Sequence, residues 1–222
     1  MSAESNMSAT QDPGPVTGDD VLEAVALTLA ALRPARDADW DVLAGSLEWT
    51  CWETGEHLAD DLFGYAAQIG SPHPMADAYV PFGGQRRRPE GPVNTITADK
   101  SAGPAGLLQV IEACGGLLAA VARVTPGSAR GEHVFGASDP EGFAAMGVIE
   151  TLVHAHDMTS GLGLDFVPPA DLCARTLHRL FPDAPEGAEP WAALLWLTGR
   201  GELPGRERVV GKWRWYGAPR AT

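Results

Sequence analysis

The sequence predicts an all-α protein, a four-helix bundle with one or two extra C-terminal helices and a short extended C-terminal arm. Two observations carry this prediction. Four long segments repeat apolar residues at helical spacing between capping and breaking residues. The alternation of strand and helix that a parallel sheet requires is absent. A chain of 222 residues, 45% of them hydrophobic, is long enough to bury the core of one domain.

Residues 21–32 repeat apolar side chains at helical spacing and are followed by Pro34, which predicts a first helix. The second helix is predicted over residues 51–69. Thr50 and Glu53 form a capping-box pattern at its start, and Gly70 follows its end. Both boundaries of the second helix are therefore marked in the sequence.

Residues 71–103 contain many prolines and glycines and predict a long surface connection. Pro104 then begins a third helix, which we expect to continue to residue 124 and to be weakened at Gly115 and Gly116. The third helix thus follows the longest segment that is predicted to be irregular.

Asp139 as N-cap and Pro140 at the first helical position begin a fourth helix, which runs to about Ser160. A fifth helix is predicted over residues 170–181 and a shorter sixth over residues 189–199. Residues 207–220 are rich in β-branched and aromatic side chains, which is typical of a short strand or an extended arm. The resulting division is a leader at 1–18, a helical bundle at 19–201 and an arm at 202–222.

Composition argues against nucleic acid as a partner. The formal net charge is −13, whereas a protein that binds phosphates needs a basic face. The one dense basic run consists of Arg86, Arg87 and Arg88, and we expect it to be a solvated loop.

Targeting and redox features favour a cytoplasmic protein with no membrane partner. Residues 1–18 lack the pattern of a signal peptide, and their Ser, Asp, Pro and Gly content predicts disorder. No apolar run approaches the roughly 18 residues that cross a bilayer. Cys51, Cys114 and Cys173 are widely spaced, as is usual for reduced cysteines.

The fourth predicted helix carries titratable residues in an apolar setting. Glu150 and His154 are four residues apart and share one face of the helix, with Asp157 near that face. His156 is rotated from His154 by about 200° and points elsewhere. A buried, unpaired Glu150 would be unfavourable, which favours a partner for its charge.

Two ligands on one helix cannot complete a metal site, and His57 on the second helix is the best candidate for a third. Two histidines and one carboxylate suit zinc or another late divalent metal, and three protein ligands leave a coordination position open. A Glu and a His at this spacing also occur by chance as an exposed pair without a metal, and that alternative stays open on spacing alone.

Two motifs resemble those of a known family. The stretch "LEWTCWETGEHLADDL" at 47–62 resembles the second-helix signature of the DinB/YfiT-like metalloproteins, and "IETLVHAHDMTSGLGL" at 149–164 resembles their Glu-x2-Val-His-x2-Asp signature. The most similar branch is the N-terminal domain of mycothiol-dependent maleylpyruvate isomerase, and "LLWLTGR" at 194–200 resembles a further segment of that branch.

The resemblance implies a DinB-like bundle in which His57, Glu150 and His154 bind one divalent metal, usually zinc. It also implies that Asp157 supports a ligand or anchors the helix end. Two features depart from the family. His156 stands where a bulky aromatic residue is frequent, and too few residues follow Arg200 for the C-terminal domain of the full isomerase.

These features predict a metal-dependent thiol transferase, in which a low-molecular-weight thiol such as mycothiol adds to a small electrophile. The arginines at 86–88 and Arg200 are candidates to hold carboxylates of either molecule, with Arg86 and Arg200 taken as the cofactor-binding pair. The alternatives are a metal-dependent hydrolase or isomerase, and a stress-response protein that binds metal without turnover. The C-terminal arm either packs across the bundle or forms a homodimer.

Overall fold

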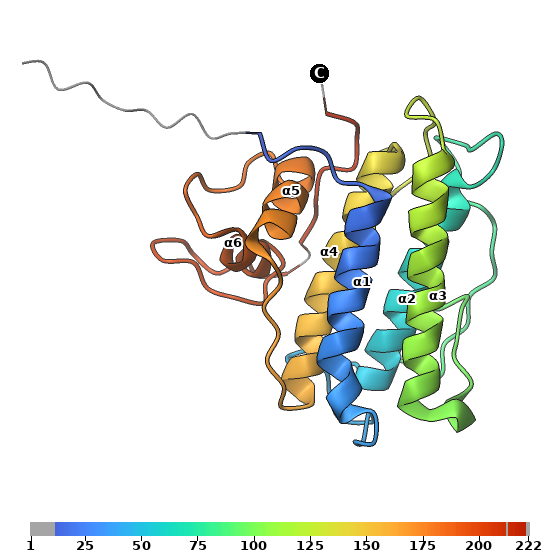
Figure 1. Cartoon of the computed structure of the whole chain (residues 1–222), viewed down its shortest axis with the longest axis vertical. Coiled ribbons are helices and arrows are strands. Elements are labelled where there is room, and N and C mark those ends of the chain that lie inside the picture. The colour runs from blue at the N-terminus through green and yellow to red at the C-terminus, as the bar shows by residue number, and fades with distance from the viewer. Residues whose placement is uncertain (1–11, 212, 221–222) are drawn as a thin grey trace, which may run out of the picture.

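The chain folds into helices joined by irregular segments, and the prediction of an all-α protein is confirmed. The computed structural model describes residues 12–211 and 213–220, and these ranges contain no strand (Figure 1). The helices are α1 Gly18–Leu32, α2 Cys51–Ile69, α3 Gly103–Val124, α4 Pro140–Gly161, α5 Ala170–Leu180 and α6 Pro190–Leu197, with short 3-10 helices η1 Arg33–Ala35 and η2 Lys100–Ala102.

The four long helices α1 to α4 lie side by side, and α5 and α6 form a smaller group beside α4 (Figure 1). Helix α1 packs against α3 and α4, and α2 packs against the same two helices. Almost all of α4 is buried. A helix that is covered on every side places its polar residues inside the protein, so the position of α4 puts Glu150 and His154 in the interior.

Helix boundaries agree with the capping residues in the sequence. The Thr50 side chain accepts a hydrogen bond from the backbone N–H of Glu53, and the Glu53 carboxylate accepts one from the backbone N–H of Thr50. The Asp139 side chain caps α4 in the same way through the N–H of Gly142. These bonds satisfy N–H groups that the first turn of a helix leaves unpaired.

The first helix begins earlier than predicted, at Gly18. Thr17 and Asp20 form a capping box that periodicity alone did not reveal. Val16 is buried, so the last residues of the predicted disordered leader belong to the folded part of the chain. The first eleven residues of that leader lie outside the described part of the structure.

Helix α3 is continuous through Gly115 and Gly116, where weakening was expected. A Cβ atom on Gly115 would lie 2.6 Å from Cγ2 of Val25, whereas one on Gly116 would meet nothing within 4 Å. Gly115 therefore allows α1 and α3 to approach closely.

The expectation that no segment is long and apolar enough to cross a bilayer is wrong for one helix. Residues Lys100–Val124 pass that test by length and composition, and 39% of the apolar window is buried. The α3 part of this segment packs against α1, α2 and α4. A core helix passes the same test, so the finding is compatible with a soluble protein.

The connection between α2 and α3 is tied to α2 by side chains. The Gln68 amide donates to the carbonyl of Ala78 and accepts from the N–H of Val80. Asp60 Oδ1 accepts from the backbone N–H groups of Thr95 and Ile96 at 2.7 and 2.6 Å. These bonds fix the connection at two places along the helix.

The prediction that the arginines at 86–88 form a solvated loop needs correction. Arg87 donates two hydrogen bonds to Glu56, whose carboxylate is almost fully buried in α2. Arg88 donates two to Glu53, the capping residue of α2. Both arginines are partly exposed, but they hold the connection against α2.

The C-terminal arm contains no strand within its described residues and packs across the helices. Trp215 is buried, and the N–H of Tyr216 donates to the carbonyl of Leu180 at the end of α5. The N–H of Gly217 donates to the carbonyl of Phe135, in the segment before α4. The arm therefore joins α5 to the start of α4.

Candidate metal centre

Helices α2 and α4 bring three potential metal ligands together in the interior. His57 and Asp61 lie one turn apart on α2, and His154 faces them from α4. One ligand atom from each of these residues lies within 4.8 Å of the others. The imidazole centroids of His57 and His154 are 5.4 Å apart. Two segments far apart in the sequence thus converge.

A chain of charged contacts orients His154. Its Nδ1 atom lies 3.1 Å from Asp157 Oδ2, and Asp157 in turn accepts hydrogen bonds from Nε and Nη2 of Arg200. All three side chains are buried. This support of one ring nitrogen leaves Nε2 available to a ligand, as is usual for histidines that bind metals.

Glu150 lies beside His154 but outside the group of three. Its Oε2 atom is 3.2 Å from His154 Nε2, the nitrogen that a metal ion would use. Of the predicted ligands His57, Glu150 and His154, the structure brings the two histidines into one cluster and places Glu150 at its edge.

Asp61 was not predicted as a ligand, although the sequence contained a signal for it. It follows His57 by four residues, the same spacing that relates Glu150 to His154. His57 Nε2 lies 3.3 Å from Asp61 Oδ2. The signal was missed because three ligands already completed the expected set.

Burial and nearby charges give the two histidines opposite behaviour. Burial and the neighbouring His154 lower the pKa of His57 to about 4, so it is neutral near pH 7. Burial also opposes a charge on His154, but hydrogen bonds with Asp157 and Glu150 raise its pKa to about 9. In the metal-free protein a proton on His154 therefore compensates the neighbouring carboxylates.

Asp61 lacks such compensation. Burial, together with the charge of Glu150, raises the pKa of Asp61 well above its usual value. Asp61 Oδ2 and His57 Nδ1 are both buried without a hydrogen-bond partner among the described residues. Buried polar atoms without partners are rare in folded proteins and often mark a site that binds an ion or a ligand.

The donor set fits a divalent cation. Nitrogen and oxygen ligands lie about 2.0–2.2 Å from a zinc ion, so two of them in a tetrahedral site are about 3.4 Å apart. The three donor atoms here lie within 4.8 Å of one another, and side-chain rotations that move them by about an ångström would complete such a site. Imidazole and carboxylate together suit zinc and other late divalent metals.

A cavity of about 390 Å³ adjoins the cluster through Asp61. It lies between α2 and the two irregular segments that cover this side of the molecule. Its wall includes Asp60, Asp61, Gly64, Tyr65, Gln68, Tyr79, Val80, Phe82, Thr95, Glu132, His133 and Phe143. A small molecule in this cavity would lie next to a cation held by the cluster.

Arg86 and Arg200 were predicted to hold carboxylates of a cofactor or substrate. Arg200 is engaged by Asp157 and by the carbonyl of Thr198, and Arg86 donates to the carbonyl of Gly91. Neither belongs to the cluster or to the wall of the adjoining cavity. Their role toward a cofactor stays a prediction, and the geometry adds a structural role for Arg200.

Other titratable residues near the centre have different surroundings. His156 is half-buried and packs its ring edge against Trp191, 5.9 Å between centroids. The Cys51 thiol is buried, and burial with the charge of Asp157 raises its pKa to about 11. His133, in the segment before α4, is buried and stacked on Trp215. The sequence around His133 did not reveal this burial.

Comparison with family models, with curated proteins and with solved structures finds no match to this chain. Membership of the DinB/YfiT-like superfamily therefore stays a prediction from the two motifs. The geometry of the centre does not depend on that membership.

Proposed function

We propose that this protein is a divalent-metal-dependent enzyme that adds a low-molecular-weight thiol to a small electrophilic substrate. The observation that supports this function best is the position of His57, Asp61 and His154 beside a cavity of about 390 Å³. A metal that only stabilised the fold would be enclosed by four protein ligands. Here the ligand group borders a space in which a substrate can lie.

A divalent ion, when bound, supplies positive charge that lowers the pKa of a thiol or a water molecule, so that it becomes a nucleophile near neutral pH. The residues of this chain provide the rest. His57 and His154 would supply ring nitrogens to the ion and Asp61 a carboxylate oxygen. Asp157 and Arg200 fix the orientation of His154, and Glu150 balances the charge. We take zinc as the ion, because imidazole and carboxylate ligands suit it.

In the net reaction a sulfur–carbon bond forms and the S–H bond of the thiol breaks. One bond of the electrophile, an activated alkene or an epoxide, breaks as well, and the proton goes to its adjacent carbon or oxygen. Tyr65 lines the cavity, and burial raises the pKa of its phenol well above the usual value. A phenol that keeps its proton can donate a hydrogen bond to an oxygen atom on which negative charge develops.

The direct test is conjugate formation. Purified protein loaded with Zn²⁺ is incubated with mycothiol and a panel of activated alkenes and epoxides, and products are measured by mass spectrometry. We expect conjugate to form faster than without protein, and His154→Ala to abolish the increase. Hydrolysed electrophile without conjugate would identify water as the nucleophile. No product from either nucleophile, in a protein that holds metal, would indicate a binding protein instead.

A further inference from the structure

The cavity next to the candidate metal centre has an unusual charge for a site that would receive a carboxylate. Asp60, Asp61 and Glu132 line it, and none of the described residues in its wall is a lysine or an arginine. His133 does not supply a positive charge near pH 7, because burial lowers its pKa to about 4. The titratable side chains of the wall are therefore either acidic or neutral.

Aromatic rings form much of the remaining wall. Tyr65 and Phe143 pack against each other with centroids 5.8 Å apart, and Phe82 packs against Phe63 at 5.3 Å. Tyr79 completes this side of the wall. The faces of aromatic rings carry negative electrostatic potential, and they attract organic cations within about 6 Å.

The acidic groups are held in place and not merely exposed on a flexible surface. Asp60 accepts two backbone hydrogen bonds from Thr95 and Ile96, which fix the position of its carboxylate. Burial raises the pKa of Asp60 above its usual value, and these two bonds oppose that rise. Asp61 belongs to the cavity wall, and its Oδ2 atom is buried 3.3 Å from His57 Nε2 without forming a hydrogen bond among the described residues.

A divalent ion in the cluster does not reverse the charge of the site. Glu150 and Asp61 together offer two negative charges against the two positive charges of the ion, and the imidazoles of His57 and His154 would bind it in their neutral form. Asp60 and Glu132 then remain as the uncompensated charges of the cavity.

We propose that this cavity binds a small organic cation, an aliphatic amine or quaternary ammonium group placed between the carboxylates and the aromatic rings. The proposal rests on the function proposed above and gives the chemical class of its substrate. An electrophile that carries a carboxylate would be repelled by Asp60 and Glu132, because the wall offers no compensating cation. An ammonium group would be attracted both by these carboxylates and by the aromatic rings.

Three probes of nearly equal shape test the proposal: choline, the neutral 3,3-dimethylbutan-1-ol and the anionic 3,3-dimethylbutanoate. Each is titrated into the full-length protein, with and without one equivalent of Zn²⁺, and followed by amide NMR. We expect choline to saturate in the millimolar range, the neutral probe to bind at least about tenfold more weakly, and the anion to give no saturable shifts.

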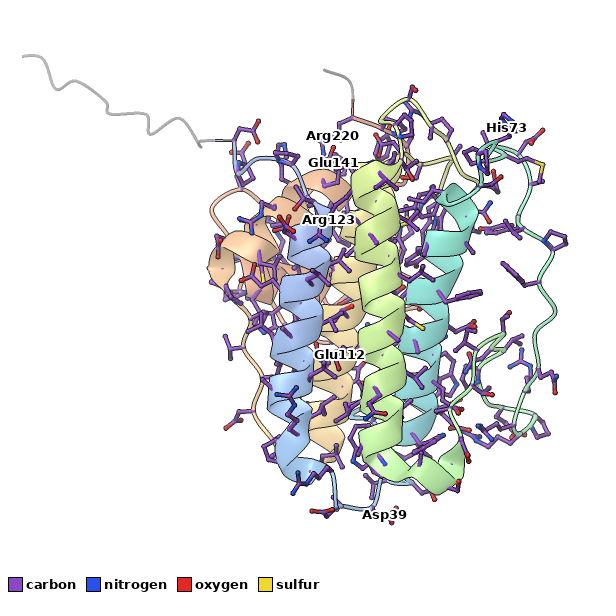
Figure 2. All side chains as sticks on the ribbon, turned by 45° about the vertical axis from the view of Figure 1, so that its right-hand side comes forward. Asp39, His73, Glu112, Arg123, Glu141 and Arg220 are labelled. Atoms are coloured by element: carbon purple, nitrogen blue, oxygen red, sulfur yellow. The ribbon has the colours of Figure 1, made fainter. Side chains whose placement is uncertain are left out.

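Two variants localise the effect. Asp60→Asn keeps an oxygen that accepts the bonds from Thr95 and Ile96, and Glu132→Gln changes only charge. Each should weaken choline binding about two- to fivefold, and the double variant about tenfold. The control is Glu112→Gln at an exposed position on α3 that is not part of the cavity wall (Figure 2). It should bind choline like the wild type.

Equal binding of the three probes, preference for the anion, or wild-type choline affinity in the double variant would overturn the proposal. These outcomes are separable from failure of the proposed function. A protein that binds Zn²⁺ and forms thiol conjugates but does not prefer choline refutes the cation site alone. A protein that prefers choline but holds no metal and forms no conjugate refutes the metal-dependent function and supports the cation site.

Discussion

At position 61 a partly exposed carboxylate lies beside the imidazoles of His57 and His154, and its Oδ2 atom is buried without a hydrogen bond among the described residues. Its neighbour Asp60 differs, because its carboxylate is satisfied by two backbone N–H groups. The pair allows a matched experiment, since the same substitution can be made at two adjacent positions of α2. Only one of these positions belongs to the cluster of potential ligands.

We predict that Asp61→Asn lowers the affinity for Zn²⁺ at least about tenfold, because an amide is a poorer ligand than a carboxylate and carries no charge. Asp60→Asn should leave the affinity within about twofold of the wild type. Competition with a chromophoric chelator at pH 7.5 measures both. Equal affinities in the two variants would remove Asp61 from the centre.

The buried pair of Asp157 and Arg200 allows a prediction about stability. Arg200→Met removes one of the two cations beside the buried Asp157 carboxylate and leaves protonated His154 as the other. We expect the metal-free protein to lose about 3 kcal/mol of unfolding free energy, the lower end of the cost of breaking a buried pair. The double variant Asp157→Asn/Arg200→Met should lose less than the single variant. Urea unfolding followed by circular dichroism gives both values.

A surface pair is the control for this measurement. Arg123 and Asp19 also form an ion pair, but their side chains are 44% and 83% exposed, and Arg123 lies at the surface near the end of α3 (Figure 2). Arg123→Met should cost less than about 1 kcal/mol. A similar loss of unfolding free energy in Arg123→Met and Arg200→Met would show that burial does not make the Asp157–Arg200 pair more important for stability than an exposed pair.

His133 gives a prediction about pH. Its folded-state pKa is about 4 because it is buried, whereas an unfolded histidine has a pKa near 6.5. Between these values the unfolded chain binds a proton that the folded chain does not, so stability falls as pH falls from 6.5 to 4. The full contribution is roughly 3 kcal/mol, and His57 acts in the same direction.

His133→Phe should therefore reduce the loss of stability between pH 6.5 and 4, measured by urea unfolding in the presence of a chelator. The comparison variant is His73→Gln, at an exposed position of the connection that follows α2 (Figure 2). It should retain the wild-type dependence on pH. An unchanged dependence in His133→Phe would contradict the burial argument.

At the scale of the helices, two adjacent glycines of α3 differ in what surrounds them. A methyl group at Gly115 would collide with the stiff, β-branched Val25 of α1, whereas one at Gly116 would meet nothing within 4 Å. We predict that Gly115→Ala destabilises the protein by about 1–3 kcal/mol. Gly116→Ala should stabilise it by about 0.5–1 kcal/mol through higher helix propensity.

Thermal unfolding of the two variants measures this difference. Both substitutions are the same and the positions are adjacent, so a general effect of removing glycine from α3 would change both melting temperatures in the same direction. Shifts of opposite sign are the predicted result.

The helices show how far local sequence determines structure here. Thr50, Glu53 and Asp139 marked two helix starts correctly, because a cap is a contact within four residues. The same locality made Glu150 and His154 recognisable on one face. The capping box at Thr17 precedes the first apolar repeat at Val21, so periodicity alone predicts an α1 that is three residues too short.

The connection between α2 and α3 could not be predicted in this way. Its proline and glycine content indicated irregular backbone, but its position depends on Arg87 and Asp60 contacting residues more than thirty positions away. Such contacts leave no periodic pattern in the sequence. The cavity that this connection covers was consequently not foreseen, nor was the burial of His133.

At the scale of the whole molecule, α2 and α4 carry the candidate centre, and the connection between α2 and α3 and the segment before α4 cover the adjoining cavity. The net charge of −13 and the acidic wall of the cavity both favour the approach of cations, whether metal ions or small organic molecules. Helix packing thus places His57 and His154 where a positively charged ligand would be stabilised.

The most direct test is the metal content of the intact protein after Zn²⁺ loading and exhaustive dialysis, determined by mass spectrometry of the element. We predict about one ion per chain in the wild type and in Glu112→Gln, and loss of most of this metal in both His57→Ala and His154→Ala, with circular dichroism confirming that the variants remain helical. One ion per chain retained in both histidine variants would contradict a centre shared between α2 and α4.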